Sequence, residues 1–412
     1  MRILFFSTAF PQPYEPSRNP DNLERCVALA RHHTVRVLSP YTWLRLARRS
    51  HRDERHVRGV PVSRPLFFYP TGVLHGTHAW WMWQGIRREA SRTIAAFRPD
   101  AVLSYWTYPD TAVAATLAKF ADVPCVAIVG GSDVLAIDPA APTAAGRRVQ
   151  RVLRSVDAIA AVSDNIKERI ASLGVEAQKI AVLSAAVDNT IFSPGSRADA
   201  RRRLEMAGDA QILVWVGRMV TVKALDVLLD AIGRLTPSRP RLRLYLVGDG
   251  PLRRSLESKV AAADLANHVV FAGRVAHRDL PDYYRAADVT LLPSAWEGMP
   301  NVLLESHACG TPFVASAVGA IPQLANPDFD ELITPGDRRQ LEDAIARTLV
   351  RSGNHRRMPS SGAQGWEEMA DQLAALLETA RARRFTSAVD VQAAATARTH
   401  RHPHPSRSWI AS

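Results

Sequence analysis

Short apolar runs alternate with longer stretches of helical periodicity along most of the chain. In the first half the apolar runs fall at 2–8, 33–40, 100–106, 123–130, 157–163 and 179–187. In the second half they fall at 210–217, 242–250, 268–275, 288–294 and 312–318. Unbroken apolar strands separated by helices are typical of parallel sheets covered on both faces. The two series therefore predict two Rossmann-like, doubly wound α/β domains that face each other across a cleft.

A polar segment around Pro194 and Gly195 separates the two series. It predicts an N-terminal domain over 1–190 and a C-terminal domain over 195–355. After a second irregular stretch, apolar residues recur at helical spacing in 366–384, which predicts an amphipathic helix. The remaining segment, 385–412, is basic and poor in large apolar residues, which predicts a disordered tail.

Composition places the chain among soluble globular proteins. Of its 412 residues, 47% are hydrophobic and 22% are charged, and no apolar run is as long as a membrane-spanning helix. The three cysteines are far apart in the sequence, which favours a reducing compartment and the cytoplasm and gives no zinc-binding spacing. The formal net charge of +12 favours anionic partners such as phosphorylated metabolites or acidic lipid.

Candidate chemistry lies at the strand ends of the second half. Gly217 closes the strand at 210–217, and Arg218 and Lys223 follow it before an apolar helix begins. In open α/β sheets, ligands bind beyond the carboxyl ends of the strands. Two cations held at such an edge can neutralise a diphosphate, so these residues predict part of a phosphate site.

Two glutamates eight positions apart flank the start of another helix. Glu297 follows the strand at 288–294, and Glu305 lies about one turn inside the helix that begins near residue 300. The N–H groups at a helix start bind anions, and a carboxylate accepts hydrogen bonds from sugar hydroxyls. The residues expected to surround the ligand here are Gly298, Met299, Pro300 and Asn301. Together with the upstream cations they predict a nucleotide-sugar site.

The second half resembles glycosyltransferase family 4, whose members are retaining enzymes of the GT-B architecture. The matching segments are "VGRMVTVKALDVLLDAI", "LVGDGPLR" and "FAGRVAHRDLPDYYRAADVTLLPSAWEGMPNVLLESHACGTPFVAS". The resemblance implies that Arg218, Lys223 and Glu297 serve catalysis and that Glu305 binds the ribose. It also implies that Arg274 and Val275 lie beside the base, and that the helix at 366–384 crosses back onto the first domain.

The first half resembles the teichuronic acid and exopolysaccharide glycosyltransferases within that family. The segment "YWTYPDTAVAATLAKFADVPCVAIVGGSDV" carries this likeness and implies that Asp133 belongs to the binding site. Several positions depart from the family pattern. The loop around Asn19 has no glycine, Gly130 stands where a basic residue is common, and alanine follows Lys223 where glycine is usual. In "GAIPQ", Ala320 and Gln323 replace the usual glycine and glutamate.

The leading hypothesis is a retaining transfer of sugar from a UDP- or GDP-sugar to an acceptor hydroxyl in cell-surface polysaccharide or glycolipid synthesis. No Asp-x-Asp metal motif is evident among the candidate site residues, so no metal is expected to be essential. The departures motivate an alternative, in which a weakened GT-B protein binds a nucleotide sugar or a partner transferase without turnover. A sugar-nucleotide epimerase and a nucleic-acid binder are less favoured, because no matching acid–base residues and no recognised nucleic-acid module occur.

The acceptor side carries two further features. The segment around 45–58 is densely basic, and Trp80, Trp81 and Trp83 lie close to Arg87 and Arg88. Aromatic and basic residues together suit an anionic membrane surface, which predicts a lipid-linked or glycan acceptor and peripheral association with the inner face of the membrane. The competing interpretation is a solvated loop followed by a helix whose tryptophans pack inward.

Overall fold

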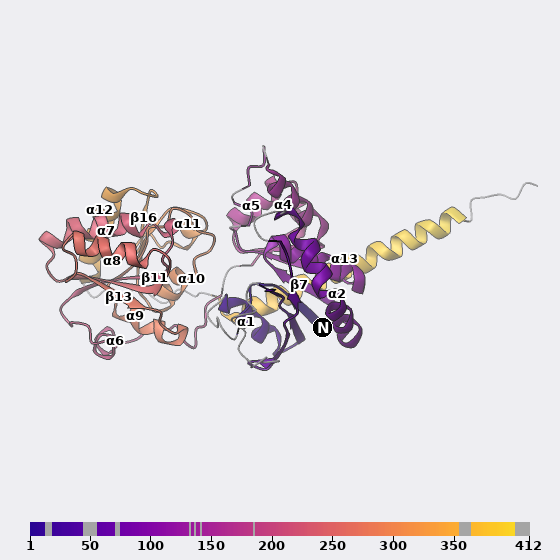
Figure 1. Ribbon diagram of the computed structural model, residues 1–412, viewed down its shortest axis with the longest axis horizontal. Coiled ribbons are helices and arrows are strands. Elements are labelled where there is room, and N and C mark those ends of the chain that lie inside the picture. Colours follow the sequence, from indigo (N-terminus) through magenta and orange to yellow (C-terminus); the bar gives the residue numbers. More distant parts are fainter. Residues whose placement is uncertain are drawn as a thin grey trace, which may run out of the picture.

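A computed structural model describes residues 1–12, 19–43, 56–70, 75–131, 133–135, 137–140, 142–183, 186–353 and 364–399 (Figure 1). The chain forms two α/β domains that lie side by side, each with its own sheet and with helices on the sheet faces. The predicted fold class is confirmed. The basic segment predicted around 45–58 lies largely outside the described residues.

The N-terminal sheet has the strand order β10-β9-β8-β7-β1-β2-β5-β4. Neighbouring strands run parallel except for the β4–β5 pair. The strands are β1 (Arg2–Phe6), β2 (Thr34–Leu38), β4 (His56–Val57), β5 (Val60–Ser63), β7 (Ala101–Tyr105), β8 (Cys125–Val129), β9 (Ala158–Ala161) and β10 (Ile180–Val182). All residues of β8 and β9 are buried, which is why these strands are continuous apolar runs in the sequence.

The C-terminal sheet is entirely parallel, with the order β13-β12-β11-β14-β15-β16. Its strands are β11 (Gln211–Arg218), β12 (Leu242–Asp249), β13 (Val269–Gly273), β14 (Val289–Leu292), β15 (Phe313–Ser316) and β16 (Glu331–Ile333). The chain builds outward in one direction from β11 and then returns to the other side of β11 with β14. The strand order therefore reverses between β11 and β14, where doubly wound sheets leave a crevice for ligands.

The helices cover both sheets. They are α1 (Pro20–Leu29), α2 (His78–Phe97), α3 (Ala112–Ala121), α4 (Ala144–Ser155), α5 (Asp164–Ser172), α6 (Arg197–Arg203), α7 (Leu225–Leu235), α8 (Arg253–Ala262), α9 (Leu280–Ala286), α10 (Asn301–Ala308), α11 (Ile321–Leu324), α12 (Arg338–Gly353) and α13 (Trp366–Thr399). Every apolar run predicted as a strand contains one. The strands β4, β5 and β16 and the small parallel sheet of β3 (Tyr41–Thr42) and β6 (Leu66–Phe67) were not predicted, because strands of two to four residues show little periodicity.

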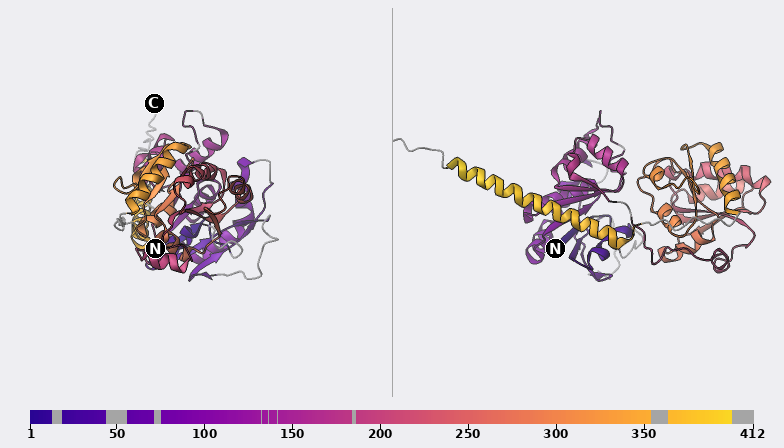
Figure 2. Two further views of the ribbon diagram at one scale, coloured as in Figure 1. Left: turned by 90° about the vertical axis from the view of Figure 1, so that its left-hand side faces the viewer. Right: turned by 180° about the vertical axis from the view of Figure 1, so that it is seen from behind.

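The last described helix belongs to the first domain. Met369, Leu373 and Leu377 of α13 are buried in the same core cluster as β1 and β8. Figure 2 shows α13 running across the N-terminal domain and projecting beyond it. The structure differs here from the disordered tail predicted from residue 385, because the helix continues to Thr399. The alanine-rich sequence of this stretch has high helix propensity, which accounts for the difference. Residues 400–412 lie outside the described residues.

Candidate active site

The crevice between β11 and β14 brings together two of the predicted site residues. Lys223 ends a short 3₁₀ turn, Thr221–Lys223, that follows β11, and Glu297 lies in the loop after β14. The Lys223 Nζ is 2.5 Å from the Glu297 Oε1. The Ser294 hydroxyl donates to the same oxygen at 2.6 Å. The Glu297 carboxylate is thus almost buried and compensated by one cation and one hydroxyl.

Arg218 lies at the last position of β11 and is exposed. Within the described part of the chain it has no ion-pair partner, so its guanidinium is available to a ligand. The ends of β11 and β12 approach closely at Gly217, because a Cβ on Gly248 would lie 1.8 Å from the Gly217 carbonyl oxygen. Arg218 ends β11 and Lys223 lies in the turn that follows it, and two cations at such a strand end suit a diphosphate.

The turn after Glu297 leads directly into α10, as predicted. Pro300 caps the helix, and Asn301 is its first residue. Residues 319 and 320 pack against this turn. A Cβ on Gly319 would lie 2.2 Å from the Glu297 carbonyl oxygen, and the Ala320 N–H donates to the Gly298 carbonyl at 3.0 Å. The loop is therefore held in one conformation, with the helix start facing the N-terminal domain.

Glu305 is held by two residues that the sequence did not single out. The His277 Nε2 lies 2.9 Å from one of its carboxylate oxygens, and the Tyr284 hydroxyl donates to the other at 2.7 Å. Burial would lower the pKa of His277, but the hydrogen bond and charge of Glu305 outweigh it and raise that pKa. Glu305 is buried and already carries two partners, so a ribose would share this carboxylate with His277.

Two further predicted residues lie farther along the same sheet edge. Arg274 follows β13, is largely exposed, and has its Nε 3.5 Å from an Asp249 carboxylate oxygen at the end of β12. Val275 packs against the core of the C-terminal domain. In the described part of the chain, neither residue forms a hydrogen bond or ion pair with Glu297 or Glu305, so the structure brings them to the edge of the site rather than into its centre.

The N-terminal wall touches the Glu297 turn through glycine backbone. A Cβ on Gly298 would lie 2.4 Å from the Gly130 carbonyl oxygen, and a Cβ on Gly131 would lie 3.1 Å from the Gly298 Cα. Met299 packs against the N-terminal core. The Asn165 side-chain amide donates to the Gly319 carbonyl at 3.2 Å. At this point the backbones of the two domains therefore approach each other directly, with almost no side chain between them.

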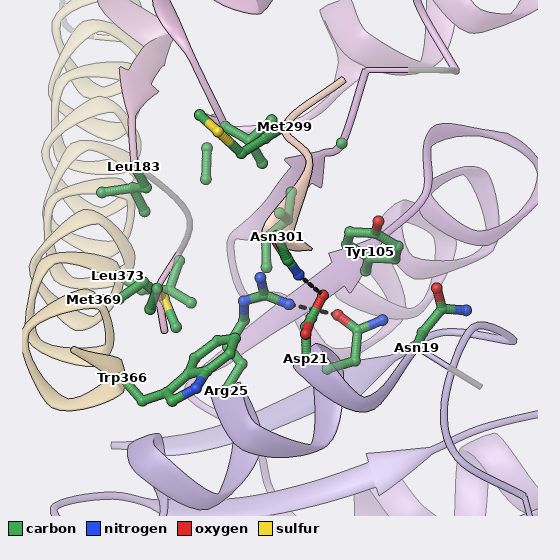
Figure 3. A pocket seen from close by; sticks show the side chains of 16 residues that line it. Asn19, Asp21, Arg25, Tyr105, Leu183, Met299, Asn301, Trp366, Met369 and Leu373 are labelled. Carbon is green, nitrogen blue, oxygen red and sulfur yellow. Dashed lines mark hydrogen bonds between the residues drawn. The ribbon is translucent and has the colours of Figure 1, made fainter. Parts of the chain in front are cut away.

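A cavity of about 80 Å³ lies beside this contact, between the two domains and the start of α13 (Figure 3). Asn301 donates to the Asp21 carboxylate across the domain boundary. The Arg25 guanidinium lies 5.8 Å from the ring centre of Tyr105 and 5.9 Å from that of Trp366. Burial raises the pKa of Asp21, against the opposing attraction of Arg25. The cavity thus offers polar side chains and aromatic rings beside the Glu297 turn.

A second cavity, of about 270 Å³, lies within the N-terminal domain. Its lining includes Trp106, Tyr108, Asp133 and Arg148. The Asp133 carboxylate is held by the backbone N–H of Thr107 at 3.0 Å and that of Gly131 at 3.1 Å. Burial raises the pKa of Asp133, although these hydrogen bonds oppose the shift. The Arg148 guanidinium lies 5.8 Å from the ring centre of Tyr108. Asp133 therefore lines this cavity, next to the glycines that touch the Glu297 turn.

Comparisons with known families account for most of the chain. Residues 210–351 match the family described as "Glycosyl transferases group 1". Residues 22–186 match the family described as "Glycosyl transferase 4-like domain". Both domains of the chain therefore match glycosyltransferase families. The predicted family is confirmed.

Two relatives illustrate the functions named among similar proteins. A D-inositol 3-phosphate glycosyltransferase of Geodermatophilus obscurus is 33% identical over 71% of this chain and 64% of its own length. The chain thus spans less than two thirds of that relative. A protein of Bacillus subtilis named as a teichuronic acid biosynthesis glycosyltransferase is 27% identical over 84% of this chain and 89% of its own length. The solved structure of Anabaena HepE with UDP has a TM-score of 0.70 at 17% identity, and the match covers 92% of this chain and all of HepE, which shows the shared fold.

Each departure of this glycosyltransferase from the family pattern has a structural counterpart. Asn19 and Ala224 have φ of 44° and 50°, the left-handed conformation in which glycine is the usual residue. A Cβ on Gly130 would lie 2.8 Å from the Tyr105 hydroxyl, so that hydroxyl fills the space of the absent side chain. Ala320 has an ordinary helical conformation that needs no glycine, and Gln323 is exposed.

The residues that the sequence did not reveal lie both inside and outside the matched segments. His277 begins a short 3₁₀ turn and Tyr284 lies in the helix α9 that follows it, and nothing in the sequence marks either as a partner of Glu305. Asp21 and Arg25 lie on α1, far from Asn301 in the sequence. Among the described residues, no cluster of three His, Cys, Asp or Glu side chains is arranged to hold a metal ion, and no helix there has the length and hydropathy to cross a bilayer.

Proposed function

We propose that this glycosyltransferase moves a sugar from a nucleotide-diphosphate sugar to an acceptor hydroxyl with retention at the anomeric carbon. The observation that carries the proposal is the meeting of Lys223 and Glu297 at 2.5 Å in the crevice between β11 and β14. Arg218 is exposed at the same edge and unpaired within the described chain. Cations beside a buried carboxylate and a helix start form a site for a sugar that carries two phosphates.

Each group of this site has a role in the proposed reaction. Arg218 and Lys223 neutralise the diphosphate and stabilise the charge that develops as it departs. Glu297 accepts hydrogen bonds from sugar hydroxyls, and the first N–H groups of α10 face the phosphates. Glu305, oriented by His277, accepts from the ribose hydroxyls. Arg274 and Val275 border the base at the outer edge of the site.

Retention follows from attack on the face that the diphosphate leaves. The bond between the anomeric carbon and the phosphate oxygen breaks, and the acceptor oxygen bonds to the same face. The acceptor proton passes to the departing phosphate oxygen, so no protein nucleophile takes part. The protein contributes position and electrostatic stabilisation, each such contact typically worth ~10²–10³ in rate.

The acceptor fits the cavity of the N-terminal domain. Arg148 gives this cavity a cation and Asp133 gives it a carboxylate, beside the aromatic rings of Trp106 and Tyr108. This set suits a sugar that bears a phosphate, either free or lipid-linked. The relatives named for inositol phosphate and for teichuronic acid synthesis support such an acceptor and a role in cell-surface glycan synthesis. We expect Arg148→Gln to raise the acceptor KM and to leave the affinity for donor unchanged.

A thermal-shift panel of UDP-, GDP- and ADP-sugars tests the donor site. A ligand at 100 times its Kd stabilises by about 2.7 kcal/mol, which raises the Tm of a domain of this size by about 5–10 °C. We expect UDP-sugars to give the largest shift, because HepE was solved with UDP, and GDP-sugars to be the next candidates. If none of the three classes shifts the Tm, the donor assignment is wrong.

Release of nucleotide then separates transfer from binding alone. The weakened alternative predicts a thermal shift without nucleotide release, whereas the proposed function predicts both. The left-handed backbone of Asn19 and Ala224 favours turnover, since these residues keep the loop conformations that glycine would otherwise provide. Because no metal is expected to be essential, a chelator should leave the rate unchanged.

A further inference from the structure

Exposed aromatic side chains gather on one face of the N-terminal domain. Trp43, Phe68 and Trp80 have exposed fractions of 39%, 52% and 54%, and Leu66 of β6 is 41% exposed. Trp81 is half-buried behind them. These five residues are called the aromatic face below. Large side chains at this exposure are costly in water when they are contiguous, which marks a surface that is covered in use.

The rings of the aromatic face form one continuous row. Trp43 and Phe68 stack with ring centres 5.4 Å apart. Phe68 meets Trp81 edge-on at 6.2 Å, and Trp81 meets Trp80 edge-on at 4.7 Å. The exposed rings therefore support one another and present a single surface, unlike scattered apolar residues that need no explanation.

The row is fixed by the backbone beneath it. Trp43 follows β3 and Phe68 follows β6, and these two strands pair with Tyr41 opposite Leu66. The helix α2 lies directly on β6, because a Cβ on Gly85 would come 2.7 Å from the Phe67 Cβ. This close approach places Trp81 of α2 next to Phe68, and Trp80 next to Trp81.

The same helix carries exposed cations beside the rings. Arg87, Arg88 and Arg92 of α2 are exposed. Glu89 is the one acid in the sequence of this helix. Trp83 packs against the core, so the interpretation of inward-packing tryptophans holds for Trp83 and not for Trp80. Exposed tryptophans flanked by arginines are typical of a surface that lies in the headgroup region of an anionic bilayer.

We propose that the aromatic face docks the enzyme onto an anionic lipid bilayer. The rings enter the headgroup region, and the arginines of α2 pair with lipid phosphates. The inference rests on the proposed function in one respect, since it makes the acceptor a lipid-linked one. His78 connects the aromatic face with the second cavity, where the acceptor is proposed to bind. Its ring centre lies 4.3 Å from that of Tyr69, which follows Phe68, and His78 also lines that cavity.

Sedimentation of the full-length protein with vesicles tests this docking. Vesicles of phosphatidylcholine with phosphatidylglycerol are compared with phosphatidylcholine alone. We expect binding to the anionic vesicles, and a loss of at least about tenfold in affinity for Phe68→Ser combined with Trp80→Ser. The matched control is Phe120→Ser on α3, since Phe120 is 61% exposed and lies outside the aromatic face.

The charge contribution is tested in parallel. Arg87→Glu and Arg88→Glu should each weaken binding to anionic vesicles by at least about fivefold, because one basic residue near such a surface contributes about 1 kcal/mol. Arg254 of α8 is exposed and serves as the control position. Arg254→Glu should leave vesicle binding unchanged, apart from the effect of the small loss of net charge.

Three results would overturn the proposal. One is equal binding to both kinds of vesicle. Another is an equal loss of binding in the Phe120 control. The last is self-association of the protein that disappears in the Phe68 and Trp80 variant without any vesicle binding, since this would assign the face to a second copy. The thermal shift with donor, measured on the same variants, should not change, so failure of the docking is distinguishable from failure of the donor site.

Discussion

Replacement of Lys223 by alanine separates the two effects of its contact with Glu297. The ammonium lies 2.5 Å from the Glu297 carboxylate, and the two side chains are only 21% and 11% exposed. Breaking a fully buried ion pair costs about 3–5 kcal/mol, and breaking an exposed one costs about 0–1 kcal/mol. Because Lys223 is partly exposed and Ser294 still donates to Glu297, we expect a stability loss of about 1–3 kcal/mol.

The loss of turnover should be larger than the loss of stability explains. Lys223 faces the diphosphate of the proposed donor, and removal of one such electrostatic contact typically lowers the rate by ~10²–10³. A second substitution, Glu297→Gln, removes the carboxylate that Lys223→Ala leaves unpaired. The double variant should therefore regain most of the stability and none of the turnover.

Urea denaturation and nucleotide release measure the two quantities on the same samples. Lys259→Ala is the matched control, because the Lys259 Nζ also lies 2.5 Å from a carboxylate oxygen, that of Asp230, in the same domain and away from the site. Turnover within about threefold of wild type in Lys223→Ala, or an equal loss in Lys259→Ala, refutes the reasoning.

Three further predictions concern the same site. Gly298→Ala should abolish turnover and increase the radius of gyration measured by X-ray scattering. The alanine Cβ would lie 2.4 Å from the Gly130 carbonyl oxygen, which pushes the two domains apart. An unchanged radius of gyration contradicts this prediction. His277→Gln should lower the unfolding free energy most below about pH 6.5 and progressively less above it. The reason is that the pKa of His277 is raised in the folded state, so its stabilising contact with Glu305 is lost as pH rises through that pKa. A difference in urea midpoints that does not depend on pH argues against this prediction. Ala224→Gly should stabilise by about 1 kcal/mol, because glycine adopts the left-handed backbone without strain, and calorimetry would show a higher Tm.

The strands, and the placing of Glu297 at a strand end, were predictable because a buried parallel strand is a continuous apolar run in the sequence. Each apolar run predicted a strand, and the position of Glu297 after such a run placed it at a strand end. Its contact with Lys223 follows from topology, since the strands that precede the two residues are neighbours in the sheet. The roles assigned to all of the predicted site residues, Lys223 and Glu297 included, stay predictions.

The rest depends on contacts between segments that are distant in the sequence. Nothing local marks His277 and Tyr284 as partners of Glu305, because their pairing arises only when α9 and the 3₁₀ turn before it pack beside α10. The bond between Asp21 and Asn301 depends on how the two domains meet. The aromatic face was visible only as a cluster of tryptophans, since the burial of Trp83 and the exposure of Trp80 require coordinates.

The position of α13 also determines the order in which the protein can be completed during synthesis. Leu373 and Leu377 fill the core built by the first strands, although they are added after every strand of the C-terminal domain. The C-terminal domain has all its strands between Gln211 and Ile333, so it can close while the ribosome is still adding α13. The domain that is made first is therefore the domain that is finished last, and a truncation before Trp366 leaves its apolar surface uncovered.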